Sequence, residues 1–296
     1  MRFIRKRVSI GENIFYACNY LFLFLCVVVA VFPLIHVVAT SLSSSNAIAS
    51  GKVFLTPVEL TYNSYHEIFR DGNVLRSLKN TVVITLIGTA LNMIFTIMCA
   101  YPLSRRRLKG RGFFSGLFVF TMIFGGGLIP GFLLVKSLKL IDTYWALWLP
   151  GLISVYNMII LKNCFQNIPD SLEEAAMIDG ANDIYILVKI MLPLASSVLA
   201  TLSLFSAVGW WNEYYNSMIF LNSTTKLPAT VRLMQMIESA NRSSLLNGEG
   251  VTANELVTPE GIKAATIVVT MVPILCVYPF LQKYFVKGVM IGSVKG

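Results

Sequence analysis

The chain has 296 residues, of which 55% are hydrophobic and 13% are charged, and its mean hydropathy is +0.68. Soluble domains carry about twice this share of charged residues, so the composition predicts an integral membrane protein and excludes a soluble globular one. The net charge of +9 does not indicate nucleic-acid binding, because that function needs a basic soluble face with aromatic residues, and the sequence offers none.

Six apolar runs are long enough to cross roughly 30 Å of hydrocarbon as helices. The predicted fold class is therefore all-α, with six transmembrane helices and a cytoplasmic helix-turn-helix between the fourth and the fifth. We expect a basic N-terminal segment, residues 1–12, and a single transmembrane domain, residues 13–296. The spans are predicted at about residues 14–39, 80–103, 113–135, 143–162, 194–220 and 264–283.

The basic residues near the span ends predict the orientation. They gather before the first span and in the link 105–111 between the second and third spans, and such segments stay in the cytoplasm. With six spans, both termini are then cytoplasmic. The first apolar run is too long for a secretory signal peptide, although Ala47 to Ala49 resembles a cleavage site, and we interpret it as a membrane anchor.

The third predicted span contains residues that would break a helix in a soluble protein, namely Gly125, Gly126, Gly127, Pro130 and Gly131. Inside a membrane, irregular backbone is tolerated where it packs against other helices or lines a water-filled cavity. Close helix packing and a place in a transport path are therefore both open interpretations.

Residues 168–193 form a charged insertion between the fourth and fifth spans, on the predicted cytoplasmic side. Ser171 lies three residues before Glu174, which is the spacing of a capping box, so we expect a helix to start near Ser171. Glu173 and Glu174 would then occupy its first turn, where the helix dipole favours carboxylates. Ala175 and Ala176 would give this helix a face of small side chains, which another element can approach closely.

The end of this short helix and the start of the next one also carry signals. Gly180 suits the left-handed conformation that commonly ends a helix. Asn182 or Asp183 can cap a second, mostly apolar helix. Pro193 is expected where a kink or a fresh first turn begins the next span.

A second cluster of polar and aromatic residues lies in the fifth apolar run. Aromatic residues at the end of a span commonly form a belt at the membrane interface. A carboxylate at membrane depth, however, normally faces a cavity or a partner, and aromatic faces beside amide and carboxylate groups also suit a sugar. We therefore weigh a structural belt and a substrate pathway equally for these residues: Trp210, Trp211, Asn212, Glu213, Tyr215 and Asn216.

The sequence lacks the motifs of several enzyme classes. No phosphate-binding Gly-x4-Gly-Lys-Ser/Thr loop, no His-Glu-x2-His and no Gly-x-Ser-x-Gly occurs in it. The five cysteines lie in or beside apolar runs without paired metal-binding spacing. We therefore predict no catalytic, cofactor or metal site on this chain.

One pattern in the insertion resembles a known family. Glu174-Ala175-Ala176, then Gly180 after three residues, then Ile190, Leu192 and Pro193 match the spacing of the EAA motif of bacterial ABC importer permeases. Asp179 and Ala181, on either side of the glycine, are also usual in that motif. The stretches GGGLIP, WALWLPG and WWNEYYNS further resemble the carbohydrate branch, which includes permeases for pectin and alginate fragments.

The resemblance implies partners and a role that the composition alone does not. The chain would be a multi-pass subunit of the bacterial cytoplasmic (inner) membrane, paired with a second, homologous permease subunit. Two cytoplasmic ATPase subunits would bind ATP and Mg, and an extracellular or periplasmic sugar-binding protein would deliver a sugar or oligosaccharide. The residues implied to couple to the ATPase are Ser171, Glu173, Glu174, Ala175, Ala176, Asp179, Gly180, Ala181 and Pro193.

Other functions stay open at this point. A secondary carrier or channel would explain six spans, but not a capped acidic helix-turn-helix without ion-coupling carboxylates inside the membrane. A membrane scaffold or sensor would explain a docking helix, but not Glu213 among aromatic residues. A permease of the same type for a solute other than a sugar is a further alternative.

Overall fold

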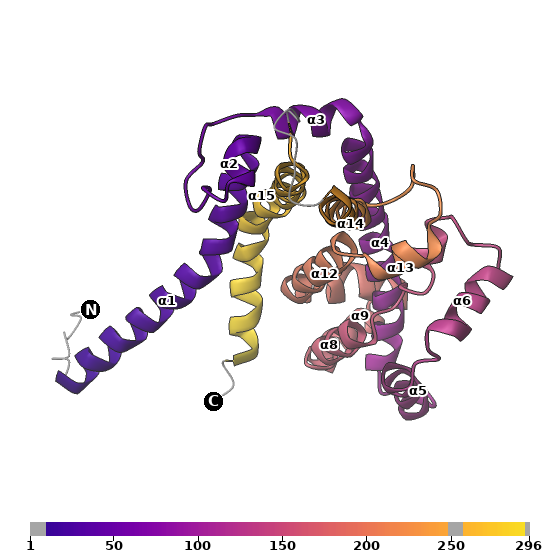
Figure 1. Cartoon of the computed structure of the whole chain (residues 1–296). Helices are drawn as coiled ribbons and strands as arrows, with labels where there is room; N and C mark the ends of the chain where they lie inside the picture. Colours follow the sequence, from indigo (N-terminus) through magenta and orange to yellow (C-terminus); the bar gives the residue numbers. More distant parts are fainter. Residues whose placement is uncertain (1–9, 248–256, 294–296) are drawn as a thin grey trace. The chain divides into compact units, whose positions relative to one another are not determined.

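The computed structural model describes residues 10–247 and 257–293, and all regular structure in these residues is helical (Figure 1). The chain divides into two compact units. One comprises Met1–Asp71 with Met236–Val269, and the other comprises Gly72–Gln235 with Thr270–Gly296. The basic residues before residue 10, which orient the first span in the sequence analysis, lie outside the described residues, as does Lys295.

The first unit contains the most hydrophobic of the described helical segments that could cross a membrane. Helix α1, Ile10–Ser41, is strongly hydrophobic and exposes most of its side chains, as a lipid-facing helix does. After it, Ser44 caps the short α2, Ser45–Ala49, by accepting the Ala47 N–H. Helix α3, Asn63–Asp71, has one polar and one apolar face, as expected of a helix that lies along a membrane surface.

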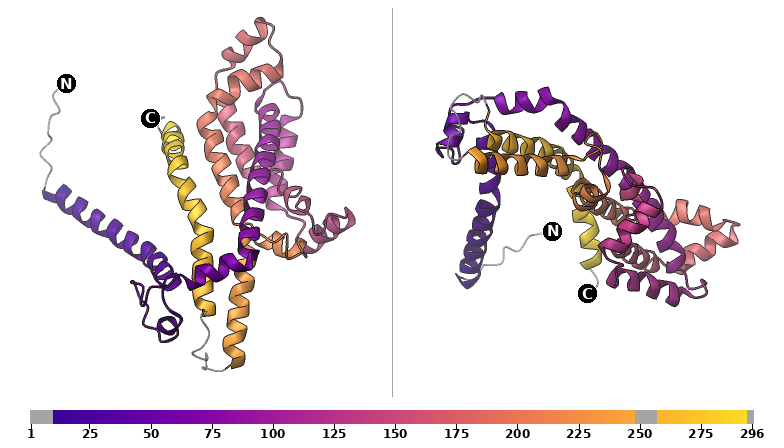
Figure 2. Two further views of the ribbon diagram at one scale, coloured as in Figure 1. Left: turned by 90° about the horizontal axis from the view of Figure 1, so that it is seen from above. Right: turned by 45° about the vertical axis from the view of Figure 1, so that its right-hand side comes forward.

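The second unit is built around α4, Asn73–Ser104. Helices α8, Val155–Gln166, and α12, Ser196–Trp211, pack against it, and Figures 1 and 2 show both beside α4. Their shared core is large and apolar, with the fully buried side chains of Leu161, Phe165, Ile186, Met191 and Leu202. This core also includes residues of the insertion, so the insertion is packed onto the helical unit.

One face of α4 is buried but not apolar. Its members recur every three or four residues, so they share one side of the helix: Ser77, Thr81, Thr85, Gly88, Asn92 and Thr96. Short side chains let neighbouring helices approach closely, which is how helices associate in membranes. Hydrophobicity alone, from which the span 80–103 was predicted, does not reveal this repeat of small and polar residues.

The third predicted span is bent, and the fourth is interrupted. In the third, α5, Arg111–Ile123, and α6, Leu128–Ser137, meet at 110° across the three glycines. Gly127 has a φ of 84°, which is cheap only for glycine. In the fourth, α7, Trp145–Trp148, is separated from α8 by a link that contains Pro150 and Gly151.

The fifth predicted span, 194–220, is interrupted at both ends. Before it lie α10, Asp183–Ile186, the π-helical turn η1, Leu187–Met191, and α11, Leu192–Leu194. The chain bends by 83° between α11 and α12, beside Pro193, where the sequence predicts a kink. After α12 the chain turns again before α13, Tyr215–Phe220.

The remaining helices are α9, Asp170–Ile178, which is described below, α14, Ala229–Asn247, and α15, Pro259–Ser293. Within the described residues, three helical segments are long and apolar enough to cross a membrane: Gly11–Ser41, Asn73–Ser104 and Pro259–Cys276. The number rises to five when each bent pair counts as one span. The chain is thus a multi-pass helical protein, and the number of six spans stays a prediction.

Candidate functional site

The insertion folds as a helix-turn-helix, but its first helix is capped differently from the prediction. Helix α9, Asp170–Ile178, begins one residue before Ser171, and its N-cap is Pro169, which has no side-chain hydrogen-bonding group. The predicted capping box of Ser171 and Glu174 is therefore wrong. Asp170 supplies the first acidic residue of α9.

The turn after α9 is well defined. Gly180 has a φ of 83°, and its N–H donates to the carbonyl of Met177 at 3.0 Å, while the Ala181 N–H donates to that of Ala176 at 2.9 Å. These two bonds form a Schellman motif, which ends a helix at a left-handed residue. Asn182, rather than Asp183, then caps α10 by accepting the Tyr185 N–H at 2.8 Å.

The residues of α9 face two ways. Ala176 is buried in the core, whereas Ser171, Glu174, Ala175, Asp179 and Gly180 are exposed, and Ile178 exposes 86% of its surface. A hollow of about 540 Å³ lies beside them, lined by Ala176, Asp179, Gly180, Ala181, Asn182, Tyr185, Lys189 and Ile190. A carboxylate among exposed apolar residues beside a hollow suits the docking of another protein.

Glu173 does not belong to this exposed face. Its side chain is only 7% exposed and forms an ion pair with Arg105, which is 8% exposed. Arg107 Nη2 lies 3.3 Å from the other Glu173 carboxylate oxygen and also binds Asp183. Glu173 is therefore held within the chain, unlike the exposed Glu174, and its part in coupling stays a prediction.

The arginines of the link 105–111 were expected only to orient the protein in the membrane. Both the basic link and the acidic insertion were predicted on the cytoplasmic side. Their opposite charges could therefore have indicated an ion pair between them. The hydrogen bond from Arg107 to Asp183 raises the pKa of the guanidinium above its usual value. The pairing thus stabilises both charges where the link meets the insertion.

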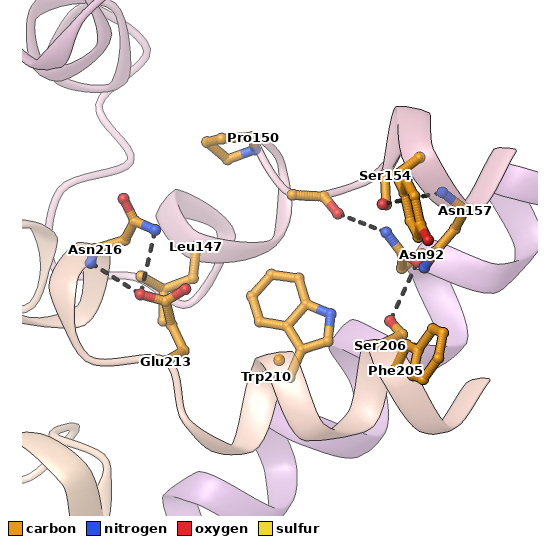
Figure 3. A pocket seen from close by; sticks show the side chains of 13 residues that line it. Asn92, Leu147, Pro150, Ser154, Asn157, Phe205, Ser206, Trp210, Glu213 and Asn216 are labelled. Atoms are coloured by element: carbon orange, nitrogen blue, oxygen red, sulfur yellow. Dashed lines mark hydrogen bonds between the residues drawn. The ribbon is translucent and has the colours of Figure 1, made fainter. Parts of the chain in front are cut away.

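A pocket of about 560 Å³, lined by apolar and polar residues and called the polar pocket below for its hydrogen-bonding groups, lies in the second unit (Figure 3). It lies between α4, the link from α7 to α8, α12 and the turn before α13. Its volume falls within the range of small-molecule sites. The pocket is lined by Asn92, Leu147, Pro150, Gly151, Ser154, Tyr156, Asn157, Phe205, Ser206, Gly209, Trp210, Glu213 and Asn216.

Asn92 links three elements of this pocket (Figure 3). Its amide nitrogen donates to the carbonyls of Gly151 at 3.0 Å and Leu152 at 3.3 Å. Its oxygen accepts a hydrogen bond from the Ser206 hydroxyl at 3.1 Å. Sequence analysis missed Asn92 and Ser206, because each is a single polar residue in an apolar run, and only the three-to-four-residue repeat on α4 could have indicated Asn92.

Trp210 forms one wall of the pocket and is wedged between two glycines. A Cβ added at Gly88 or at Gly151 would lie 2.7 Å from atoms of its indole. On the neighbouring turn, Glu213 accepts hydrogen bonds from the backbone N–H of Asn216 at 2.9 Å and from its side chain at 3.2 Å. Figure 3 shows the indole between the Asn92 group and the Glu213 group.

The pocket brings together half of the residues suggested for a pathway. Trp210, Glu213 and Asn216 line it, whereas Trp211, Asn212 and Tyr215 do not. The Asn212 side chain instead donates to the carbonyl of Val208 on its own helix at 2.9 Å. Trp210 and Trp211 both lie on α12, where consecutive residues point in different directions. The belt and the pathway both stay predictions for these residues.

A separate cluster fastens the loop after α6 to the loop after α13. The Asp142 carboxylate accepts the N–H groups of Asn222 at 3.0 Å and Ser223 at 2.9 Å, and Lys226 Nζ at 2.9 Å. Hydrogen bonds from the Ser223 side chain and backbone, and then from Lys226, hold the pKa of Asp142 well below its usual range. The cluster is a structural clasp between two loops.

Comparisons with known proteins agree with this architecture. Residues 92–291 match the model of a family described as the binding-protein-dependent transport system inner membrane component. LplC of Bacillus subtilis is 43% identical over 285 residues, 96% of each chain. The polygalacturonan/rhamnogalacturonan transport system permease protein YtcP of B. subtilis is 47% identical over 280 residues, which are 94% of this chain and 96% of YtcP.

A solved structure is also similar. It is the crystal structure of a bacterial ABC transporter involved in the import of the acidic polysaccharide alginate. One of its chains superposes with a TM-score of 0.85 and 34% identity, and the match covers 94% of this chain and 98% of that one. The resemblance to ABC importer permeases is thereby confirmed, as is the prediction of a transporter subunit rather than an enzyme. This chain belongs to the family of binding-protein-dependent transport system inner membrane components.

Proposed function

We propose that this chain is one half of the membrane pathway of an ATP-driven importer for a sugar or oligosaccharide. The observation that carries the proposal is the exposed Glu174 on a helix fixed by the Gly180 turn, in a chain without a phosphate-binding motif. Such a chain needs another protein to supply the energy of ATP, and this surface is built for contact with one.

In the proposed mechanism, two ATPase subunits bind ATP and Mg and close on each other in the cytoplasm. Their closure pushes α9, with Glu174 and Ala175 in contact with the ATPase. Gly180 and Ala181 form the sharp turn that keeps α9 and α10 at a fixed angle, and Asp179 lines the adjoining hollow. Pro193 lies at the bend where the movement passes into α12.

The polar pocket is the proposed contact of this chain with its cargo. A sugar offers apolar C–H faces and many hydroxyls, which suit an indole face beside amide, hydroxyl and carboxylate groups. Trp210, Asn92 and Glu213 supply these groups. The lining contains no Lys or Arg, so the carboxylates of an acidic sugar would bind to other subunits while its hydroxyls bind here.

The proposal includes the partners and the orientation. The second permease subunit would complete the pathway as a heterodimer, and a binding protein outside the cell would deliver the cargo to the external segments near residues 40–78 and 222–263. Both termini would be cytoplasmic in the inner membrane. The family description, which names a binding-protein-dependent system and an inner membrane component, supports the binding protein and the membrane. The orientation is supported by the basic residues near the span ends.

The proposal is tested by expressing the chain with its permease partner, ATPase and binding protein. We expect Glu174→Lys and Gly180→Pro to weaken association with the ATPase and to abolish ATP hydrolysis stimulated by the loaded binding protein. The matched control is Glu67→Gln, because Glu67 forms an exposed ion pair with Arg70 on α3. Unchanged association and stimulated hydrolysis in both variants would contradict the proposal.

The nature of the cargo is tested separately. The complex is assayed with a panel of neutral oligosaccharides, uronate oligosaccharides and non-sugar solutes. Stimulation by an oligosaccharide is expected, and its loss in Trp210→Ala would place the pocket in the pathway. Stimulation by a non-sugar solute alone would replace the sugar with that solute, while the role of the chain as a permease would stand.

A further inference from the structure

The ion pair between Glu173 and Arg105 joins α9 to the end of α4. Arg105 is the C-cap of α4, where the backbone leaves the helix in an extended conformation. Its guanidinium binds the Glu173 carboxylate, and it also lies 4.9 Å from the ring centroid of Tyr101 on α4. Both ionic side chains are more than nine-tenths buried. The α9 helix is therefore fastened to α4 by a directional, water-shielded contact.

A buried ion pair is an unusual way to fasten two helices. Removing water from two charges costs several kcal/mol per ion, and apolar residues of similar size stabilise a fold as well or better. Packing onto α9 is already provided by Ala176, which belongs to the apolar core of the unit. The pair thus adds a fixed geometry that apolar packing does not, because hydrophobic contact has no preferred direction.

The helix that receives this contact also reaches the pocket. Asn92 and Arg105 are thirteen positions apart, so α4 carries Asn92 about 20 Å from the ion pair. Helix α4 is continuous from Asn73 to Ser104, and Asn92 links it to Gly151 and Ser206 in the pocket. A displacement of α9 that moves the end of α4 would therefore move the pocket wall as well.

On this basis, and resting on the proposed function, we infer that Glu173 is a positioning residue that makes α9 and α4 move as one body. Glu174 meets the ATPase, and Glu173 passes the displacement to α4 through Arg105. The two adjacent carboxylates thus have different tasks, one directed outward and one inward. Arg107, which binds Glu173 and Asp183 from the exposed side, holds the Glu173 carboxylate in place.

The inference is tested in the assembled complex with Glu173→Ala and Arg105→Ala. Each is expected to retain association with the ATPase and to lower binding-protein-stimulated ATP hydrolysis about fivefold or more, the usual size of a coupling between sites. The double variant should lose no more than either single one, because both remove the same contact. Glu67→Ala is the matched control, since it breaks an exposed ion pair.

A distance measurement separates positioning from a general loss of structure. Spin labels are placed at Asp170, the first residue of α9, and at Leu86, an exposed residue of α4, after the five cysteines are replaced by alanine. In the parent complex, the distance between the two labels should be the same with and without trapped ATP. Glu173→Ala should keep that distance without nucleotide and change it by about 2 Å with ATP.

A variant with intact packing covers the case in which the alanine variants fail to fold. Arg105→Met with Glu173→Leu replaces the buried pair by apolar residues, which commonly preserves stability. It should assemble but lose stimulated hydrolysis. The inference would be overturned if the Glu173 and Arg105 variants hydrolysed ATP at the parental rate and kept the same label distance with and without ATP. If Glu174→Lys were inactive in the same assay, the proposed function would still stand. Parental hydrolysis in Glu174→Lys as well would overturn the proposed function together with it.

Discussion

The indole of Trp210 on α12 lies so close to Gly88 on α4 that a Cβ at position 88 would come within 2.7 Å of the ring. The contact explains why α4 carries a glycine in the middle of its buried polar face. It also gives Trp210 a structural role beside its place in the pocket wall. At this point α4 and α12 approach closely because position 88 has no side chain.

We predict that Gly88→Ala destabilises the protein by about 1–3 kcal/mol, the usual cost of forcing extra volume into a packed interior. The ring must move, since the atoms in conflict belong to a buried contact rather than to a flexible chain end. Thermal unfolding of the purified protein measures the effect. Gly131→Ala is the control, because no atom lies within 4 Å of a Cβ at that position. Equal unfolding temperatures for the two variants would contradict the prediction.

Asn92→Ala is predicted to cost about 1–3 kcal/mol of stability, because it leaves two backbone carbonyls and the Ser206 hydroxyl without their partner. Ser206→Ala removes only one of these bonds and should cost less. The comparison uses unfolding in detergent together with sugar-stimulated hydrolysis of the complex. A larger loss in Ser206→Ala than in Asn92→Ala would show that Asn92 does not organise the pocket.

Gly180→Ala tests the turn after α9 without any steric clash. Nothing lies within 4 Å of a Cβ at this position, so the only cost is the left-handed backbone, about 1 kcal/mol for alanine and less for asparagine. We expect the ATPase to bind most weakly to Gly180→Ala, more tightly to Gly180→Asn, and most tightly to the parent with glycine. The measurement is the dissociation constant of the ATPase for each variant. Identical constants for all three would refute the role of the turn.

Asp142→Asn tests the clasp between the two loops through its pH dependence. The pKa of Asp142 is lowered in the folded protein. Its contribution to the free energy of unfolding is therefore fully present above the pKa of the unfolded chain, about 3.9, and is lost as the pH falls toward the lower pKa of the folded protein. At neutral pH the variant should be about 1–2 kcal/mol less stable, the scale of hydrogen bonds to a charged group. The parent and variant should converge in stability as the medium is acidified below pH ~4.

Unfolding curves at neutral pH and at successively lower pH values supply the measurement. Lys226→Met should behave like Asp142→Asn, because it removes the cation that binds the same carboxylate. A stability difference that stayed constant through the acidic range would mean that the clasp does not depend on the ionised form of Asp142.

Local features of the insertion could be predicted from the sequence. The Gly180 turn and the Asn182 cap depend on neighbouring residues, and both occur as expected. The capping box was wrong because α9 starts at Asp170, one residue before Ser171, so Ser171 lies inside the helix and is not its N-cap. A shift of one residue removes such a cap, and residue spacing alone does not fix the first residue of a helix.

Contacts between residues far apart in the chain could not be predicted from the sequence. Arg105 and Glu173 are 68 residues apart, and a charge near a span end indicates orientation without indicating its partner. The suggested pathway residues stay a prediction, and consecutive residues of one helix point in different directions, so the structure divides neighbouring residues of the motif between the pocket and other surroundings. Trp210 faces the pocket and Trp211 does not.

The most direct test of the account is uptake by the reconstituted importer. The chain, its permease partner and the ATPase are placed in lipid vesicles with the binding protein and a labelled oligosaccharide. The account predicts accumulation that requires both ATP and the binding protein, is lost in Glu174→Lys and is retained in Glu67→Gln. Accumulation without ATP, or at the parental rate in Glu174→Lys, would contradict it.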